Sequence, residues 1–333
     1  MSNALAVFGQ RLIHESALPV LTQGYGGLVR ELAENRELAR LAREKGPDAA
    51  LAGLAHMRKG NKELVTRAEK DAEQRMADAV RKTYPAHAIV GEEHGWQPGS
   101  QTRWVFDPVD GTSAMIRSAM AEAFGLTLPS PAPSFGITVG VVDGEEPVLG
   151  IVTELQPQGG RLAAVNTWVG IQGQPTTQNG RPVSLPPVPA LAKARIACTV
   201  PEVMFNTREK WSGWQALAQA VAEIVTDQNA IGFMKLLTGQ INIAYEADLA
   251  YHDAAALAPI LRDAGITVSN AEGQALRFPE NAIGSEFRVL AAQPALHAQA
   301  MALIRAGVPP EENRFTSADS VHKGYAQKFP PHP

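Results

Sequence analysis

The stretch Trp104-Val105-Phe106-Asp107-Pro108-Val109-Asp110-Gly111-Thr112-Ser113 decides the expected fold of this chain. Its first three residues are apolar and predict a buried strand, which Pro108 and Gly111 bring to an end. Thr112 or Ser113 can then cap a helix, because either hydroxyl can accept a bond from a free backbone N–H. Two carboxylates at the carboxyl end of a strand, beside a helix N-terminus, suit a divalent cation next to a phosphate. An Asp-Gly pair alone is equally typical of a hairpin turn.

The composition is that of a globular protein with more than one core. The chain has 333 residues, of which 45% are apolar and 19% charged. Because single cores stop growing at about 250–300 residues, we expect two subdomains. The proline-rich segment 184–190 is the predicted linker. It separates an N-terminal α+β subdomain, 1–185, which carries the metal-binding motifs, from a C-terminal α/β subdomain, 186–333.

The net charge limits the kinds of partner that we expect, and the cysteine content indicates the cellular compartment. A net charge of −4 gives no basic field, so we expect neither nucleic acid nor an anionic membrane as partner. The apolar runs are shorter than the roughly 20 residues of a membrane span, and the N-terminus lacks the pattern of a signal peptide. The only cysteine, Cys198, excludes an internal disulfide and favours a reducing cytoplasm.

Hydrophobic periodicity predicts an α/β protein with a helical N-terminus. In the first half we expect helices over 5–46, 49–57 and 62–82, and strands over 88–90, 104–106, 135–142, 148–153, 162–165 and 168–171. The buried face of the third helix is predicted to carry Ala68, Ala72, Met76 and Val80. In the second half we expect strands over 195–200 and 266–268 and helices over 208–222, 233–244 and 253–263.

Acidic residues recur at the ends of these elements. Glu92 and Glu93 end one strand, Asp107 and Asp110 end the next, and Asp253 opens a helix. Two like charges about 4 Å apart repel by about 4 kcal/mol at an effective dielectric constant of 20, so converging carboxylates need cations or protons. Oxygen ligands favour Mg²⁺ or Ca²⁺ over zinc, and the spacing does not fit an EF-hand.

In this order the motifs resemble those of the Mg²⁺-dependent, lithium-sensitive phosphatases of the inositol monophosphatase superfamily. The resemblance runs from about Leu64 to Gly273. The matching segments are Val65-Thr66, Tyr84-Pro85 to Glu93, Trp104 to Thr112, Val148 to Val152, Asn179 to Pro182, His252 to Ala256 and Asp263 to Gly265. It implies a layered αβαβα sandwich of the inositol monophosphatase/fructose-1,6-bisphosphatase type.

The resemblance also implies a metal site. Glu92, Asp107 and the carbonyl of Val109 would hold one Mg²⁺, and Asp107, Asp110 and Asp253 a second. Two or three ions are expected in all, with Mn²⁺ as the alternative metal.

The remaining roles concern catalysis and substrate. The N–H groups of Gly111 and Thr112 would bind the phosphate, and Asp253 and Glu246 would contact the substrate. The resemblance implies that Thr112, oriented by Glu69, helps to deprotonate the attacking water. Glu92 would be a further catalytic residue.

The chain departs from the family pattern at several positions. Glu69 is one methylene longer than the family's aspartate, which leaves the water-activating geometry open. Glu73, one turn on, is an alternative, although a solvated helix charge is the commoner case. Ala114-Met115 replaces the usual Asn-Phe and predicts a wider site. Residues 118–133 form a longer loop that can act as a lid, and about 60 N-terminal residues can cover the site or mediate dimerisation.

The expected function is Mg²⁺-dependent hydrolysis of a small phosphorylated metabolite by a cytoplasmic homodimer. Segments 199–205 and 252–260 look most like the histidinol-phosphate phosphatase branch, and the inositol-1-phosphate branch is the second choice. A catalytically degenerate member that binds a phosphate ligand or a partner is the alternative. This alternative is considered because Glu69 and Ala114-Met115 stand where the family has other residues.

Overall fold

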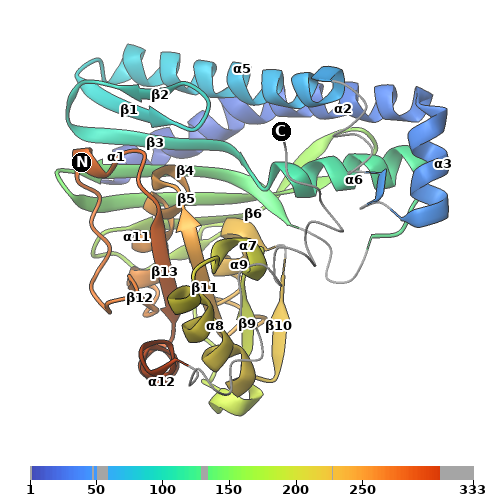
Figure 1. Ribbon diagram of the computed structural model, residues 1–333. Helices are drawn as coiled ribbons and strands as arrows, with labels where there is room; N and C mark the ends of the chain where they lie inside the picture. The colour runs from blue at the N-terminus through green and yellow to red at the C-terminus, as the bar shows by residue number, and fades with distance from the viewer. Residues whose placement is uncertain (1, 47–48, 51–58, 129–133, 227, 308–333) are drawn as a thin grey trace.

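Five layers of secondary structure build this protein (Figure 1). The computed structural model describes residues 2–46, 49–50, 59–128, 134–226 and 228–307. An outer layer of helices covers an eight-stranded sheet, and a middle layer of helices separates that sheet from a five-stranded one. A final helical layer covers the second sheet. The expected layered α/β sandwich is confirmed.

The outer helical layer comes from the N-terminal third of the chain and one later helix. Its members are α1 (Ser2–Arg11), the π-helix η1 (Leu12–Ala17), α2 (Leu18–Glu34), α3 (Arg36–Lys45), α5 (Lys59–Thr83) and α6 (Thr112–Phe124). The helix expected over 5–46 is broken at Asn35, whose side chain caps α3 by accepting a bond from Leu38 N at 3.0 Å. Most of the helix expected over 49–57 lies outside the described residues.

The first sheet contains every described strand before residue 183. These are β1 (His87–Gly91), β2 (Gly95–Gln97), β3 (Ser100–Asp110), β4 (Phe135–Asp143), β5 (Glu146–Pro157), β6 (Leu162–Ile171), β7 (Thr177–Gln178) and β8 (Arg181–Pro182). They lie in the order β2-β1-β3-β4-β5-β6-β7-β8. β1 and β3 are parallel, and the other pairs are antiparallel.

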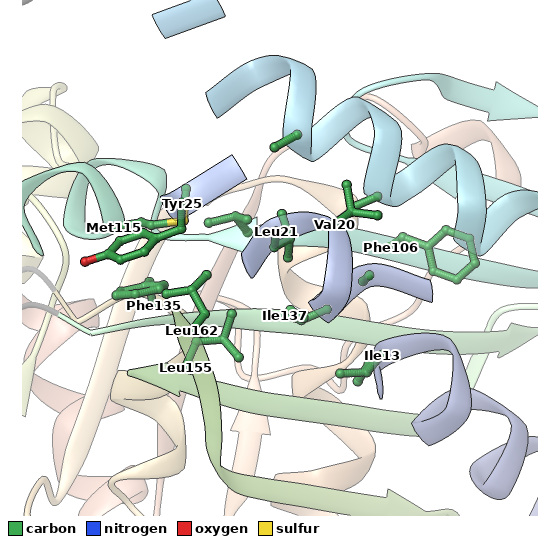
Figure 2. Packing of buried hydrophobic residues seen from close by; sticks show 14 of the residues in the cluster. Ile13, Val20, Leu21, Tyr25, Phe106, Met115, Phe135, Ile137, Leu155 and Leu162 are labelled. Carbon is green, nitrogen blue, oxygen red and sulfur yellow. The ribbon is translucent and has the colours of Figure 1, made fainter. Parts of the chain in front are cut away.

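The first hydrophobic core lies between this sheet and the outer helices. Tyr25 of α2 and Met115 of α6 pack with Phe135 and Ile137 of β4 in this cluster (Figure 2). All four residues predicted for the inner face of α5 are buried: Ala68, Ala72, Met76 and Val80. The amphipathic pattern of α5 therefore places its opposite face toward solvent and fixes which side chains can reach β1 and β3.

The second half alternates short strands and helices. Its strands are β9 (Arg195–Ala197), β10 (Glu223–Val225), β11 (Ile243–Leu249), β12 (Thr267–Ser269) and β13 (Phe287–Ala292), in the order β10-β9-β11-β13-β12. Its α-helices are α7 (Pro201–Met204), α8 (Arg208–Ala220), α9 (Asn229–Met234), α10 (Tyr251–Ala255), α11 (Leu257–Asp263) and α12 (Pro294–Ala306). Two 3-10 turns, η2 (Leu191–Lys193) and η3 (Glu280–Ala282), complete it.

The helix predicted over 233–244 is wrong. α9 ends at Met234, the chain turns through Gly239 with φ +72°, and β11 begins at Ile243. Residues 235–239 form consecutive turns, in which Leu236 N and Leu237 N bond to carbonyls three residues earlier. The left-handed Gly239 ends this apolar segment as a helix, and only its last two residues join β11, where they pair with β9 and β13.

A second core joins the two halves through the middle helices α9, α10 and α11. It contains Val105, Val152 and Trp168 of the first sheet together with Tyr251 and Ala255 of α10. The division at residue 185 therefore stays a prediction, since this core crosses it.

A buried guanidinium strengthens the same junction. Arg103 of β3 is 2% exposed and donates to the hydroxyl of Tyr251 at 3.2 Å and to the carbonyl of Phe278 at 2.7 Å. Tyr251 donates to the same carbonyl at 2.8 Å. Because Tyr251 opens α10, these bonds fix the helix that carries Asp253 against the first sheet.

Candidate active site

Three carboxylates from the two halves meet at the end of β3. One oxygen each of Asp107, Asp110 and Asp253 lies within 4.8 Å of the others. Residues three apart point to opposite faces of a regular strand. The ladder between β3 and β4 is irregular between Asp107 and Asp110, and this shift brings both carboxylates to one place.

A backbone N–H holds one oxygen of each carboxylate. Asp107 Oδ1 accepts from Val109 N at 2.8 Å, and Asp110 Oδ2 accepts from Ala230 N of α9 at 2.6 Å. Asp253 Oδ2 accepts from Ala250 N at 3.0 Å. The second oxygen of each group is therefore left without a backbone donor, which suits it to a cation.

The electrostatics of the cluster fit a divalent metal. Burial raises the pKa of Asp107 well above its usual range, and the charges of Glu92 and Asp110 raise it further. Burial, followed by the charge of Asp253, does the same to the pKa of Asp110. A buried set of carboxylate oxygens with this mutual repulsion fits Mg²⁺, which prefers oxygen ligands.

Glu92 and Val109, the other two expected ligands, border this cluster. Glu92 follows β1, is exposed, and lies close enough to raise the pKa of Asp107. The carbonyl oxygen of Val109 lies 3.3 Å from Thr112 Oγ1. Next to Glu92, the Glu93 carboxylate is largely buried and lies 4.0 Å from Lys70 Nζ.

Glu69 reaches Thr112 despite its extra methylene. Thr112 Oγ1 donates to Glu69 Oε1 at 2.7 Å. The Glu69 side chain is 5% exposed, and burial raises its pKa from 4.5 to about 7. A carboxylate poised near neutral pH and bonded to a hydroxyl is suited to take up a proton.

The N-terminus of α6 adjoins these residues. Gly111 has φ +94°, a conformation that favours glycine, and a Cβ atom there would lie 2.6 Å from Asn229 Nδ2. The first N–H groups of a helix have no partner within it, so this end attracts anions. Gly111 thus supplies the turn out of β3 and lets Asn229 pack closely against it.

The expected wider site at Ala114-Met115 is wrong. Both residues are 2% exposed and belong to the first core, so they pack in the interior and do not open a wider site. The predicted long loop is also shorter than expected, since α6 continues to Phe124. Residues 129–133 of that loop lie outside the described residues.

Glu246 lies on β11, close enough for its charge to act on Asp110. It is 1% exposed, accepts a bond from Thr199 Oγ1 at 2.8 Å, and has Cys198 Sγ 3.6 Å away. Burial raises its pKa to about 7, and the charge of Asp253 adds to the effect. Thr199 begins a segment that the sequence singled out, but its contact with Glu246 was not predicted, because no local pattern indicates a partner 47 positions away.

Glu73 is not the solvated helix charge that its position suggested. It is 1% exposed and accepts bonds from the backbone N–H groups of Glu93 and His94. Its position one turn after Glu69 was the available signal, since residues four apart share a helix face.

Comparison with known proteins places this geometry in a family. The model of the inositol monophosphatase family matches residues 21–308. The chain belongs to the inositol monophosphatase family. Among curated members it is 27% identical to the chloroplastic bifunctional phosphatase IMPL2 of Arabidopsis thaliana, over 71% of this chain and 64% of the relative. It is 38% identical to the fructose-1,6-bisphosphatase/inositol-1-monophosphatase of Aquifex aeolicus, over 28% of this chain and 31% of the relative. The matches thus span less than two thirds of either relative.

Solved structures of inositol monophosphatases share the fold. The enzyme from Zymomonas mobilis superposes with a TM-score of 0.62 at 24% identity, covering 89% of this chain and 96% of that one. Inositol monophosphatase II of Staphylococcus aureus gives a TM-score of 0.62 at 19% identity, covering 94% and 98%. Within the described part of this family member, no helix has the length and apolar character needed to cross a membrane.

Proposed function

We propose that this protein is a Mg²⁺-dependent phosphatase that hydrolyses small phosphate monoesters of the histidinol-phosphate or inositol-1-phosphate type. The observation that carries the proposal is the meeting of Asp107, Asp110 and Asp253 beside the N-terminus of α6. A dianionic phosphate needs both features, since cations and free N–H groups offset its charge.

The metal ligands in this proposal are Glu92, Asp107, the Val109 carbonyl, Asp110 and Asp253. A bound Mg²⁺ supplies a water of lowered pKa and offsets charge on the leaving oxygen. The number of ions, two or three, and the use of Mn²⁺ belong to the same proposal.

Thr112 and Glu69 form the proton route. Thr112 Oγ1 already donates to Glu69 Oε1, so the hydroxyl oxygen can accept a proton from water as its own proton passes to Glu69. The N–H groups of Gly111 and Thr112 hold the phosphate for in-line attack.

The leaving group would lie toward Glu246. A buried carboxylate that is held by Thr199 suits a hydroxyl or an ammonium group on the leaving alcohol. This supports a polyol or amino-alcohol phosphate. The names of the two curated relatives, which include a bifunctional phosphatase and an inositol-1-monophosphatase, agree with that range.

Most of the reasons for considering a catalytically degenerate protein no longer apply. Glu69 contacts Thr112, and Ala114-Met115 is core rather than site. Cytoplasmic location rests on the single buried thiol of Cys198, and a homodimer on the family resemblance alone.

Phosphate release from a substrate panel tests the proposal. Histidinol phosphate, inositol-1-phosphate, fructose-1,6-bisphosphate and adenosine 3′,5′-bisphosphate would each be assayed with Mg²⁺ and with EDTA. We expect Mg²⁺-dependent release from one of the first two, which Asp110→Asn abolishes. Asp71→Asn, an exposed aspartate on α5, is the matched control. If the folded wild-type protein releases no phosphate from any of the four compounds, the catalytically degenerate alternative is favoured.

A further inference from the structure

The turn that follows β1 donates backbone hydrogen bonds to the side chain of Glu73 on α5. Glu73 Oε2 accepts from Glu93 N at 2.9 Å, and Oε1 accepts from His94 N at 2.8 Å. His94 Nδ1 lies 3.0 Å from the same Oε1. Both oxygens of one buried carboxylate are therefore committed to the turn over residues 92–94.

Gly91 makes room for this contact. A Cβ atom at Gly91 would overlap the Glu73 carboxylate. The carboxylate can therefore occupy its present position against the end of β1 because residue 91 is a glycine.

Glu92 depends on this turn for its position. Its carboxylate shares a side-chain hydrogen bond with Asp107 but, among the described residues, accepts none from a backbone N–H, whereas Asp107, Asp110 and Asp253 each accept one. The backbone of Glu92 makes one bond, from its N–H to the carbonyl of Phe106 at 3.3 Å. On its other side the chain is fixed by the two bonds to Glu73.

We propose that Glu73 is a positioning residue for the metal site: it orders the turn that carries Glu92 toward Asp107. This inference rests on the proposed function, since Glu92 must bind the cation for its position to matter. Groups that orient a metal ligand, without touching the metal, commonly change metal affinity or activity by about 10–100-fold when removed.

The central test is Mg²⁺ affinity in Glu73→Gln. The amide keeps the shape of the side chain but turns an NH₂ group toward backbone donors and loses the charge-assisted bonds. We expect the Mg²⁺ dissociation constant from calorimetry to rise about 10–100-fold, with kcat at saturating Mg²⁺ within about threefold of wild type. Asp78→Asn on the exposed face of α5 is the matched control and should match wild type. A dissociation constant within twofold of wild type for Glu73→Gln would overturn the proposal.

His94→Ala separates the backbone bonds from the side-chain contact. It removes the His94 Nδ1 contact and leaves both N–H bonds to Glu73 in place, so we expect Mg²⁺ affinity within about threefold of wild type. A loss as large as that of Glu73→Gln would contradict the claim that the backbone turn carries the effect.

Amide hydrogen exchange provides a readout that needs neither metal nor substrate. In wild-type protein with EDTA, the amides of Glu93 and His94 should exchange slowly, and Glu73→Gln should remove this protection. Fast exchange in the wild type would refute the inference even if phosphatase activity is present. Conversely, protected amides in a protein that does not bind Mg²⁺ would refute the proposed function and leave the structural contact intact.

Discussion

Glu69 and Glu73 lie one turn apart on α5, and both are buried acids with different partners. Glu69 accepts from the hydroxyl of Thr112, whereas Glu73 accepts from the backbone of the turn after β1. Because residues four apart share a helix face, one stripe of α5 serves both the proton route and the metal-ligand turn. Burial makes each of these contacts sensitive to a change of a single methylene.

Glu69→Gln should lower kcat by at least about tenfold, because positioned proton transfer contributes about 10²–10⁴-fold and an amide cannot take up the proton that Thr112 passes on. Steady-state kinetics at saturating Mg²⁺ would measure it, and KM should change little. Thr112→Ser keeps the hydroxyl and is the companion variant that should retain activity. Wild-type kcat in Glu69→Gln would show that Glu69 does not act through Thr112.

At the scale of elements, the junction of β3 and α6 determines the site. The irregular ladder brings Asp107 and Asp110 together, and the positive φ of Gly111 turns the chain directly into the helix. α9 then covers the junction, with Ala230 N on Asp110 and Asn229 Nδ2 bonded to the carbonyl of Ser134 at 2.9 Å. The turn between two consecutive elements thus depends on a third, α9, which lies 120 positions further along the chain.

Gly111→Ala should destabilise the protein more than Gly125→Ala does. Both glycines have positive φ, which costs an L-residue about 1–2 kcal/mol, but a Cβ at Gly125 meets nothing within 4 Å. At Gly111 it would also displace the Asn229 amide. Urea unfolding would measure the difference, and phosphatase assays should show a raised KM for Gly111→Ala alone. Equal losses of stability would mean that Asn229 gives way freely.

At the scale of the whole molecule, both halves contribute acids to one buried region. Asp107 and Asp110 come from the first sheet, whereas Glu246 and Asp253 come from the second half. Burial and mutual repulsion raise the pKa of these groups. The metal-free protein is therefore destabilised by the same residues that suit it to Mg²⁺.

Stability of the metal-free protein should fall as pH rises. The pKa values of Glu69 and Glu246 are raised from 4.5 to about 7, so the folded state binds protons more tightly than the unfolded state. Each group thus contributes up to about 3 kcal/mol that is fully present below pH 4.5 and is lost as pH rises to about 7. Urea unfolding in EDTA between about pH 5 and pH 8 would measure the slope, which Glu246→Gln should make shallower.

Mg²⁺ should reverse this loss near neutral pH, because a ligand that binds only the folded state stabilises it. A free energy of unfolding in EDTA that is flat across this pH range, or equal slopes for wild type and Glu246→Gln, would contradict the raised pKa values.

Much of the fold follows from local sequence signals. The periodic apolar residues of α5, the strand before Asp107 and the glycine at 111 each depend on neighbours within a few positions. The error over 233–244 arose because an apolar run was taken as one helix, whereas α9 ends at Met234, turns follow through the left-handed Gly239, and β11 begins at Ile243. Similarly, the sequence predicts a surface charge at Glu73, and only the structure shows that its carboxylate accepts bonds from the turn after β1.

The sequence by itself determined which side chains are available and in what order: the Glu-Glu turn, the Asp-Pro-Val-Asp-Gly-Thr junction and the acid that opens a helix about 140 residues later. Only the tertiary structure decided that Asp253 meets Asp107 and Asp110, that Glu73 lies under Gly91 and that Ala114 and Met115 face the core. The physical reason is one of range. Strand and helix periodicity acts over a few residues, whereas these contacts depend on how two sheets and the helices between them bury their apolar faces together.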